Sequence, residues 1–262
     1  MDKWIGSVAV RRSHAKPAAM ATMAFLAFLY WFFVVAEGAY LGSRMVTLLY
    51  DRLARVYDRI KEPYMRYDRW RLAWPLLRVL SRVERPLVLD VATGTGRLPL
   101  SVAGLSDFRG YVVGVDRSAR MLREAQKKTR ELTDGVGLVR QDALALSFVD
   151  GSFDAVTCIE GLELFPKPED ALQEMARVLR PGGVLLISNR KGWGRLLLPR
   201  RAFHDGEIRR VLHGLCFGAV RLESWNRHYD LVWATKLDGQ DGWRAISSSG
   251  RQALSAPTQG VR

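Results

Sequence analysis

Two acidic residues follow short apolar runs, in positions where a nucleotide-type cofactor could be bound. One run leads through Asp90 into a turn that contains Gly94 and Gly96, and the next apolar run ends at Asp116. Glycine lets the backbone approach a ligand closely, and an acid roughly 26 residues after the first is at the spacing expected of a ribose-binding carboxylate. The pattern predicts a cofactor site at the carboxyl ends of neighbouring parallel strands.

Five short segments, in this order along the chain, resemble the class I S-adenosylmethionine-dependent methyltransferases. They are DVATGTG at 90–96, GVDRSARML at 114–122, QDA at 141–143, DGSFDAV at 150–156 and MARVLRPGG at 175–183. Within this family the chain looks most like the branch that includes quinone-biosynthesis and small-molecule methyltransferases. The resemblance implies an α/β fold, Rossmann-like and doubly wound, with a mostly parallel seven-stranded sheet, and S-adenosyl-L-methionine as the cofactor.

The resemblance also assigns roles to single residues. By it, Asp116 accepts hydrogen bonds from both ribose hydroxyls, and Asp90 positions the methionine end of the cofactor. Asp142 and the backbone of Ala143 would meet the adenine amino edge, while the family often has glycine where Ala92 stands. The predicted cofactor-binding residues are Asp90, Ala92, Gly94, Gly96, Asp116, Arg117, Asp142, Ala143 and Glu160.

Each of these acids also has a purely structural interpretation. An aspartate that ends a buried strand can cap the following helix, which applies to Asp90 and Asp116, and Asp142 can be a turn residue. Glu160, just after a predicted strand, can contact the cofactor or the acceptor, or it can be a solvated loop acid. The sequence leaves these alternatives open.

A cofactor of this kind carries an activated methyl group, so the protein mainly has to bind, align and exclude water. A general base is needed only when the acceptor has a proton to lose. His204, His213 and His228 are candidates, but each fits a surface or packing role better. No catalytic residue is assigned and no metal site is predicted. Residues 160–163, EGLE, stand where the quinone-type branch often has an Arg-Asn pair.

Alternating strands and helices must position these residues. Strands are predicted at 87–92, 111–116, 137–141, 153–159, 184–188, 220–225 and 231–236, and helices at 98–103, 119–132, 169–179 and 207–215. Such alternation is typical of a parallel sheet with helices on both faces. The last two strands are joined by a short turn, which predicts antiparallel neighbours. Pro181-Gly182-Gly183 is predicted to end a helix and turn the chain into a strand.

Composition limits the class of protein and its partners. With 48% hydrophobic and 26% charged residues, the chain of 262 residues is typical of one globular α/β domain with an extension. Its 40 Lys and Arg against 27 Asp and Glu give a net charge of +13, which favours an anionic partner, either membrane lipid or nucleic acid. Cys158 and Cys216 are predicted to be reduced thiols, since no His/Cys spacing resembles a zinc site.

The N-terminal region contains a long uncharged stretch, residues 18–36. As a helix it would extend over ~28 Å, close to the ~30 Å thickness of the hydrocarbon core of a bilayer, which predicts a membrane-spanning segment. An in-plane or re-entrant helix and a cleaved signal peptide are the alternatives. Basic residues flank both ends, so charge does not set the orientation. We expect a cytoplasmic catalytic domain because the cofactor is made in the cytoplasm.

The region after this stretch is basic and aromatic. Tyr50, Tyr57 and Tyr64 recur every seven residues on one predicted helical stripe, interrupted near Pro63. In the resembling family such segments cover the cofactor, so a lid role is expected beside simple packing. The predicted organisation is a basic tail (1–17), a membrane helix (18–36), a basic aromatic helical linker or lid (37–85), the methyltransferase domain (86–238) and a disordered tail (239–262).

The sequence therefore predicts a membrane-anchored methyltransferase that acts on a lipophilic small molecule, such as a lipid headgroup, a phenol or a quinone-like ring. The loop 189–201, which mixes cations with Trp and Leu, favours a lipid interface or an amphiphilic acceptor. One alternative is RNA methylation, although nucleic acid is a poor candidate because no RNA-binding module is recognisable. The other is an inactive, cofactor-binding scaffold at the membrane.

Overall fold

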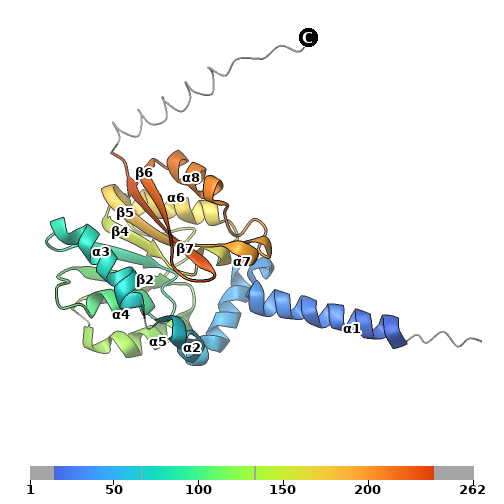
Figure 1. Cartoon of the computed structure of the whole chain (residues 1–262). Helices are drawn as coiled ribbons and strands as arrows, with labels where there is room; N and C mark the ends of the chain where they lie inside the picture. The colour runs from blue at the N-terminus through green and yellow to red at the C-terminus, as the bar shows by residue number, and fades with distance from the viewer. Residues whose placement is uncertain (1–14, 66, 133, 239–262) are drawn as a thin grey trace, which may run out of the picture.

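The computed structural model describes residues 15–65, 67–132 and 134–238. Within these residues seven strands form one sheet in the order β3-β2-β1-β4-β5-β7-β6 (Figure 1). The strands are β1 (Leu87–Val91), β2 (Tyr111–Asp116), β3 (Val136–Arg140), β4 (Phe153–Cys158), β5 (Leu179–Arg190), β6 (Phe217–Ser224) and β7 (Tyr229–Lys236). β1 to β5 pair in parallel, and β7 is antiparallel to both β5 and β6. The doubly wound, mostly parallel sheet and its antiparallel pair were predicted from the sequence and are confirmed.

Helices cover both faces of the sheet, because consecutive strand residues point to opposite sides. The covering helices are α3 (Trp74–Val79), α4 (Arg97–Ala103), α5 (Ala119–Thr129), α6 (Pro168–Val178) and α8 (Asp205–Gly214). Leu89 of β1 joins a core with α6 and α8, whereas its neighbour Val88 joins a second core with α3 and α4. Every residue of β4 is buried, as is expected of a strand covered on both faces.

The connection from α6 to β5 differs from the prediction. α6 ends at Val178, and the next residue, Leu179, is already extended and pairs with Phe153. The register then shifts, so that Ala155 pairs with Val184, and the intervening residues 180–183 form a bulge within β5. Pro181-Gly182-Gly183 therefore lies inside the strand, because Gly182 at φ +74° absorbs the extra residues without ending the pairing.

The apolar N-terminal stretch does not form the predicted membrane-spanning helix. α1 (Ala15–Tyr30) extends away from the sheet (Figure 1), and a π-helical turn, Trp31–Val35, then carries the chain onto the domain. There the Trp31 indole N–H donates to the backbone oxygen of Leu197 at 3.0 Å. None of the helices in the described residues is both long enough and apolar enough to cross a bilayer. The membrane location predicted from residues 18–36 is therefore wrong, because the aromatic end of the stretch packs on the protein.

α2 (Ser43–Met65) follows and continues through Pro63, beyond the predicted interruption. Tyr50 and Tyr57 lie on one side of it with their rings 5.9 Å apart. A second π-helical turn, Arg69–Ala73, then leads into α3. Of the predicted terminal tails, residues 1–14 and 239–262 lie outside the described residues.

Candidate functional site

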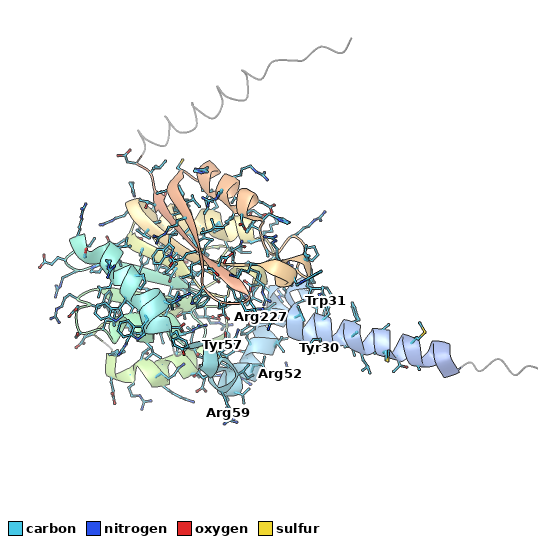
Figure 2. All side chains as sticks on the ribbon, viewed as in Figure 1. Tyr30, Trp31, Arg52, Tyr57, Arg59 and Arg227 are labelled. Atoms are coloured by element: carbon cyan, nitrogen blue, oxygen red, sulfur yellow. The ribbon has the colours of Figure 1, made fainter. Side chains whose placement is uncertain are left out.

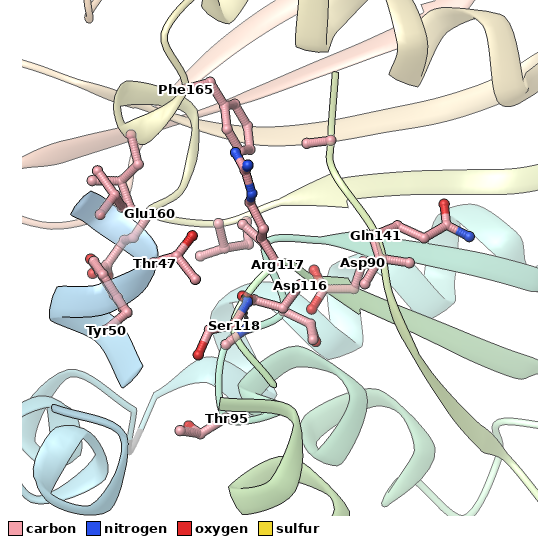
Figure 3. Close-up of a pocket in the computed structure, with 18 of the residues that line it drawn as sticks. Thr47, Tyr50, Asp90, Thr95, Asp116, Arg117, Ser118, Gln141, Glu160 and Phe165 are labelled. Carbon is pink, nitrogen blue, oxygen red and sulfur yellow. Dashed lines mark hydrogen bonds between the residues drawn. The ribbon is translucent and has the colours of Figure 1, made fainter. Parts of the chain in front are cut away.

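A cavity lies at the carboxyl ends of β1, β2 and β4, and we name it the first cavity (Figure 3). All of the predicted cofactor-binding residues except Gly96 line it: Asp90, Ala92, Gly94, Asp116, Arg117, Asp142, Ala143 and Glu160. In Figure 3 Glu160 and Tyr50 lie at one end, Gln141 lies at the other, and Asp116 lies between them. The sheet therefore brings together side chains that the sequence separates widely.

Asp116 is held by the backbone at the end of β2. Its Oδ2 accepts a hydrogen bond from the Gly94 N–H and its Oδ1 accepts one from the Ser118 N–H, each at 2.8 Å. Burial raises the pKa of Asp116, and these backbone donors oppose that rise. A carboxylate has about four lone-pair sites. The Asp116 carboxylate is thus fixed in orientation and can still accept hydrogen bonds from a ligand.

The turn after β1 has three residues in the left-handed backbone region, Ala92 (φ +57°), Gly94 (φ +54°) and Gly96 (φ +78°). A Cβ added to Gly94 would meet nothing within 4 Å, whereas one added to Gly96 would lie 3.1 Å from the Ala125 Cβ. Gly94 therefore gives the first cavity room, and Gly96 allows close packing of α4 on α5. Ala92 is strained in this conformation, which glycine would adopt without a steric cost.

Asp90 lies on β1 and is buried. Its Oδ1 accepts a hydrogen bond from the Thr157 hydroxyl of β4 at 2.7 Å. Burial raises the pKa of Asp90 to about 6, despite the hydroxyl donors that oppose the rise. At neutral pH the group is therefore a carboxylate in an unfavourable environment, and a cationic group in the cavity would stabilise it.

The far end of the first cavity is formed by the chain after β3. Asp142 Oδ1 accepts a hydrogen bond from the Leu144 N–H at 3.1 Å, and Asp142 Oδ2 lies 3.2 Å from an Arg117 guanidinium nitrogen. Asp142 thus stabilises its own turn, as the structural interpretation predicted, and it also lines the cavity. Ala143 beside it is buried.

One wall of the first cavity comes from α2, which contributes Ser43, Val46, Thr47, Tyr50 and Tyr57. Opposite this wall lies the floor of the cavity, which is formed by β1, β2 and the turns that follow them. Two aspartates of α2 accept hydrogen bonds from side chains of the floor. Asp51 accepts a hydrogen bond from the Ser118 hydroxyl at 2.5 Å, and Asp58 accepts one from the Thr95 hydroxyl at 2.5 Å. Lys128 of α5 lies 2.7 Å from the other Asp58 oxygen. The Arg120 N–H of α5 also donates to Asp51, at 3.2 Å. These contacts all reach α2 through its own side chains and hold it over the cavity.

Glu160 is held by a cation on each side. Its Oε2 accepts a hydrogen bond from Lys61 Nζ at 2.6 Å, and its Oε1 accepts one from an Arg97 guanidinium nitrogen at 3.0 Å. Burial raises the pKa of Glu160, but these two charges outweigh it and hold the pKa below its usual value. Arg97 in turn is paired with buried Asp68, at 2.7 Å for the longer of two contacts. Glu160 is therefore a buried, ionised carboxylate and not a solvated loop acid.

A second cavity lies beside the first, at the ends of β5 and β7. It is lined by Tyr30, Val35, Lys61, Glu160, Arg190, Lys191, Gly192, Trp193, Gly194, Leu197, Asn226, Arg227, His228 and Tyr229. Figure 2 shows Arg227 near Tyr30 and Trp31 at the end of α1. Glu160 lines both cavities, so the two spaces meet at this side chain.

Behind the second cavity lies a set of paired polar groups. Arg190 Nε donates to Glu163 Oε1 at 2.8 Å, and the Tyr229 hydroxyl donates to the same oxygen. The Arg190 guanidinium also stands 5.1 Å from the centre of the Tyr229 ring. Burial raises the pKa of Tyr229, and nearby Glu163 raises it further. The tyrosine is therefore a neutral hydrogen-bond donor at the back of this cavity.

The structure separates the three candidate histidines. His228 lines the second cavity, whereas His204 caps the start of α8 and His213 is exposed in its last turn. The latter two have the structural role that the sequence favoured.

Sequence reasoning missed several residues of the site. Ser118 had a signal, because a serine before a periodic apolar helix is typical of an N-cap, and its side chain accepts from the Met121 N–H. No local pattern in the sequence marks Lys61 or Arg97, because their partner Glu160 is 99 and 63 residues away, respectively.

Residues 89–187 match a family described as "Methyltransferase domain". A demethylmenaquinone methyltransferase of Porphyromonas gingivalis is 36% identical over 149 residues, which cover 55% of this chain and 60% of that protein. A ubiquinone/menaquinone biosynthesis C-methyltransferase of Syntrophotalea carbinolica is 37% identical over 141 residues, covering 53% and 58%. This chain thus spans less than two thirds of the length of these relatives.

Solved structures agree on the fold. An S-adenosylmethionine-dependent methyltransferase from Aquifex aeolicus superposes with a TM-score of 0.54 at 19% identity, covering 65% of this chain and 93% of that one. The cyclase SpnF superposes with a TM-score of 0.56 at 22% identity, covering 64% and 81%. Such low identity shows the fold and not the reaction. The sequence matches and the fold together show a methyltransferase domain over residues 89–187, with the fold of S-adenosylmethionine-dependent methyltransferases and with sequence similarity to the quinone methyltransferases named above.

Proposed function

We propose that this chain transfers a methyl group from S-adenosylmethionine to a lipophilic, quinone-type ring. The main support is that Glu160 lines both cavities, so that a donor in the first and an acceptor in the second would meet at one side chain. The activities named for the relatives from Porphyromonas gingivalis and Syntrophotalea carbinolica support the same class of acceptor.

The residues of the first cavity fit the cofactor. Asp116 has a fixed carboxylate for the ribose hydroxyls, and buried Asp90 would gain from the ammonium of the methionine end. Asp142 and the backbone of Ala143 suit the adenine amino edge. The open space at Gly94 lets the turn approach the ligand. These acids also favour the positive charge that the cofactor brings.

When bound, the cofactor supplies a methyl carbon on a positively charged sulfur; an electron pair of the acceptor forms the new bond to this carbon, and the electrons of the broken C–S bond stay on the sulfur. The chain has to align the partners and exclude water. α2 lies over the first cavity and is tied down by Asp51 and Asp58. We therefore assign a lid role to the region 37–85.

The second cavity suits a lipophilic ring. Its apolar and aromatic lining includes Val35, Leu197, Tyr30 and Trp193. The Trp193 side chain is 82% exposed and Tyr30 is 62% exposed. Large exposed aromatic side chains beside a cavity are typical of a binding site for an apolar ligand.

A transfer assay with methyl-labelled cofactor and a short-chain demethylmenaquinol tests the proposal. We expect label in the organic phase with the wild type and none with Asp116→Ala, since this change removes the acceptor of two fixed hydrogen bonds. Asp107→Ala, which removes an exposed acid outside both cavities, is the matched control and should retain the activity.

Added total RNA distinguishes the alternatives. Label in the RNA and none in the quinol would replace the proposal with RNA methylation. Cofactor binding by calorimetry without label in any fraction would favour the inactive scaffold.

A further inference from the structure

Lys61 carries a positive charge from α2 into the second cavity. Its Nζ donates to Glu160 Oε2 at 2.6 Å and lies 5.8 Å from the centre of the Tyr57 ring. The side chain keeps 20% of its surface exposed, and it lines the second cavity. An ammonium group has three N–H donors. One of them is used by Glu160, so others can meet a ligand in this cavity.

Glu160 divides the two cavities and has a different cation on each side. Arg97, which lines the first cavity, binds Oε1, and Lys61, which lines the second, binds Oε2. The arginine is balanced further by Asp68. The arrangement puts Lys61 on the acceptor side of the point at which donor and acceptor would meet.

The Lys61 ammonium stays charged over the neutral pH range. Burial lowers the pKa of Lys61, but Glu160, Tyr57 and Glu37 outweigh it and raise the pKa above its usual value. Lys61 therefore acts as a fixed positive charge and not as a base. Besides Glu160, the other ionisable groups that line the same cavity are Tyr30 at the end of α1, Arg190 on β5, Lys191, Arg227 and His228 in the loops, and Tyr229 on β7.

Building on the methyl transfer proposed above, we propose that Lys61 is a catalytic residue that binds the acceptor oxygen and stabilises it as an oxyanion. The acceptor is then a ring with an acidic hydroxyl, a phenol or a quinol. Its hydroxyl proton leaves to solvent, and the anion uses an electron pair on its ring to bond the methyl carbon. The anion and the sulfonium become a neutral product and a neutral thioether. The methylated ring carbon then loses its proton and the oxygen gains one, which restores the aromatic ring with its hydroxyl.

The first test compares pH profiles of methyl transfer to the short-chain quinol. Removing the ammonium raises the pKa of the bound hydroxyl, so the acidic limb of kcat, which reports the enzyme–substrate complex, should move up by about one pH unit or more in Lys61→Met. Below that limb the rate should fall about tenfold to hundredfold. Lys61→Arg should recover much of the loss.

Lys128→Met is the matched control for a merely structural effect. Lys128 of α5 forms an ion pair with Asp58 of α2 at 2.7 Å, and the Lys128 side chain is 28% exposed. It lines neither cavity. The control should leave the acidic limb in place. An equal shift in both lysine variants would assign the effect to a loosened α2 and overturn the proposal.

A second test needs no turnover. 4-Nitrophenol, whose phenolate absorbs visible light, is titrated in the presence of protein and the demethylated cofactor product. The wild type should lower the pKa of the bound phenol by about one unit, and Lys61→Met should abolish this shift. An equal phenol pKa in both proteins, or no binding, would refute the oxyanion site even if quinol methylation is real. A Lys61-dependent shift without quinol methylation would keep the site and reject the quinone-type acceptor.

Discussion

The floor of the first cavity and the helix that covers it are built by different means. On the floor, the Asp116 carboxylate is fixed by two backbone N–H groups, and Asp90 is set by the register of β1 against β4. α2 is fixed mainly by contacts between side chains, through hydrogen bonds and an ion pair at Asp51 and Asp58, with one backbone donor, the Arg120 N–H, to Asp51. The contacts of α2 can therefore open without disturbing the sheet, whereas those of the floor cannot.

The floor should therefore be the rigid part of the site, and α2 the part that can move to let a ligand in. Backbone hydrogen bonds within a packed sheet open only with the core, so the floor offers a ligand a preformed surface. Side-chain ties at the edge of a cavity are individually weak and depend on salt. Substitutions in the two regions should therefore differ in size and in their response to salt and pH.

The largest effect is expected where the two regions meet, at Glu160. Glu160→Gln leaves Lys61 and Arg97 without a shared buried carboxylate, which should lower the free energy of unfolding by about 4 kcal/mol. Urea unfolding measures this value. Glu169→Gln, at an exposed acid of α6, is the control and should change it little. A loss below about 1 kcal/mol would mean that the pairs behave as surface contacts.

The floor should show a pH-dependent effect at Asp90. Its pKa is raised from 3.8 to about 6 by burial, so its contribution to stability is complete below pH 3.8 and is lost as the pH rises through about 6. Asp90→Asn should therefore be more stable than the wild type at pH 7, by about 3 kcal/mol. The difference should shrink as the pH falls towards 4. A constant difference over this range would show that titration of Asp90 is not its source.

The tie of α2 at Asp58 should have a smaller effect that salt removes. Asp58→Asn breaks the pair with Lys128 and keeps a hydrogen-bond acceptor for Thr95. Cofactor affinity should fall about two- to fivefold at low salt, as is typical of a partly exposed ion pair. At high salt the variant and the wild type should become equal. Titration calorimetry at two salt concentrations measures both values.

The smallest effect is expected at Ala92 in the turn of the floor. Ala92→Gly relieves the strain of φ +57° but increases the freedom of the unfolded chain. The two contributions should leave the free energy of unfolding within about 0.5 kcal/mol of the wild type. Ala92→Val, which places a branched side chain in the same conformation, should instead lose more than about 1 kcal/mol. Equal stability of all three would exclude strain at this position.

The two regions also differ in how far they could be predicted. The strands and the acids at their ends follow from local patterns, because hydrophobic periodicity and glycine turns act over a few residues. The Lys61–Glu160–Arg97 pairs could not be predicted in this way, because they join segments that meet only after the sheet has formed. Gly96 shows the limit within a motif, since its close approach is to Ala125 and not to the cavity.

The N-terminal stretch shows a different limit. Residues 18–36 are uncharged and apolar, which is all that hydropathy measures. It does not show that the α-helix ends before Trp31 or that the Trp31 indole donates a hydrogen bond to the Leu197 backbone oxygen. An aromatic residue gives the same hydropathy in a bilayer and against a protein surface. The local change to a π-helical turn is a tertiary effect that a window of sequence does not contain.

The placement of α2 has a consequence for the order of events in turnover. α2 forms one wall of the first cavity, and in the lid role proposed above it moves before the occupant exchanges, whereas the second cavity is bordered by the exposed residues Arg227 and His228. The donor would then enter first and leave last, and the acceptor would come and go while the donor site stays closed. Product-inhibition patterns would be those of a compulsory-order mechanism, with the opening of α2 setting the slowest step.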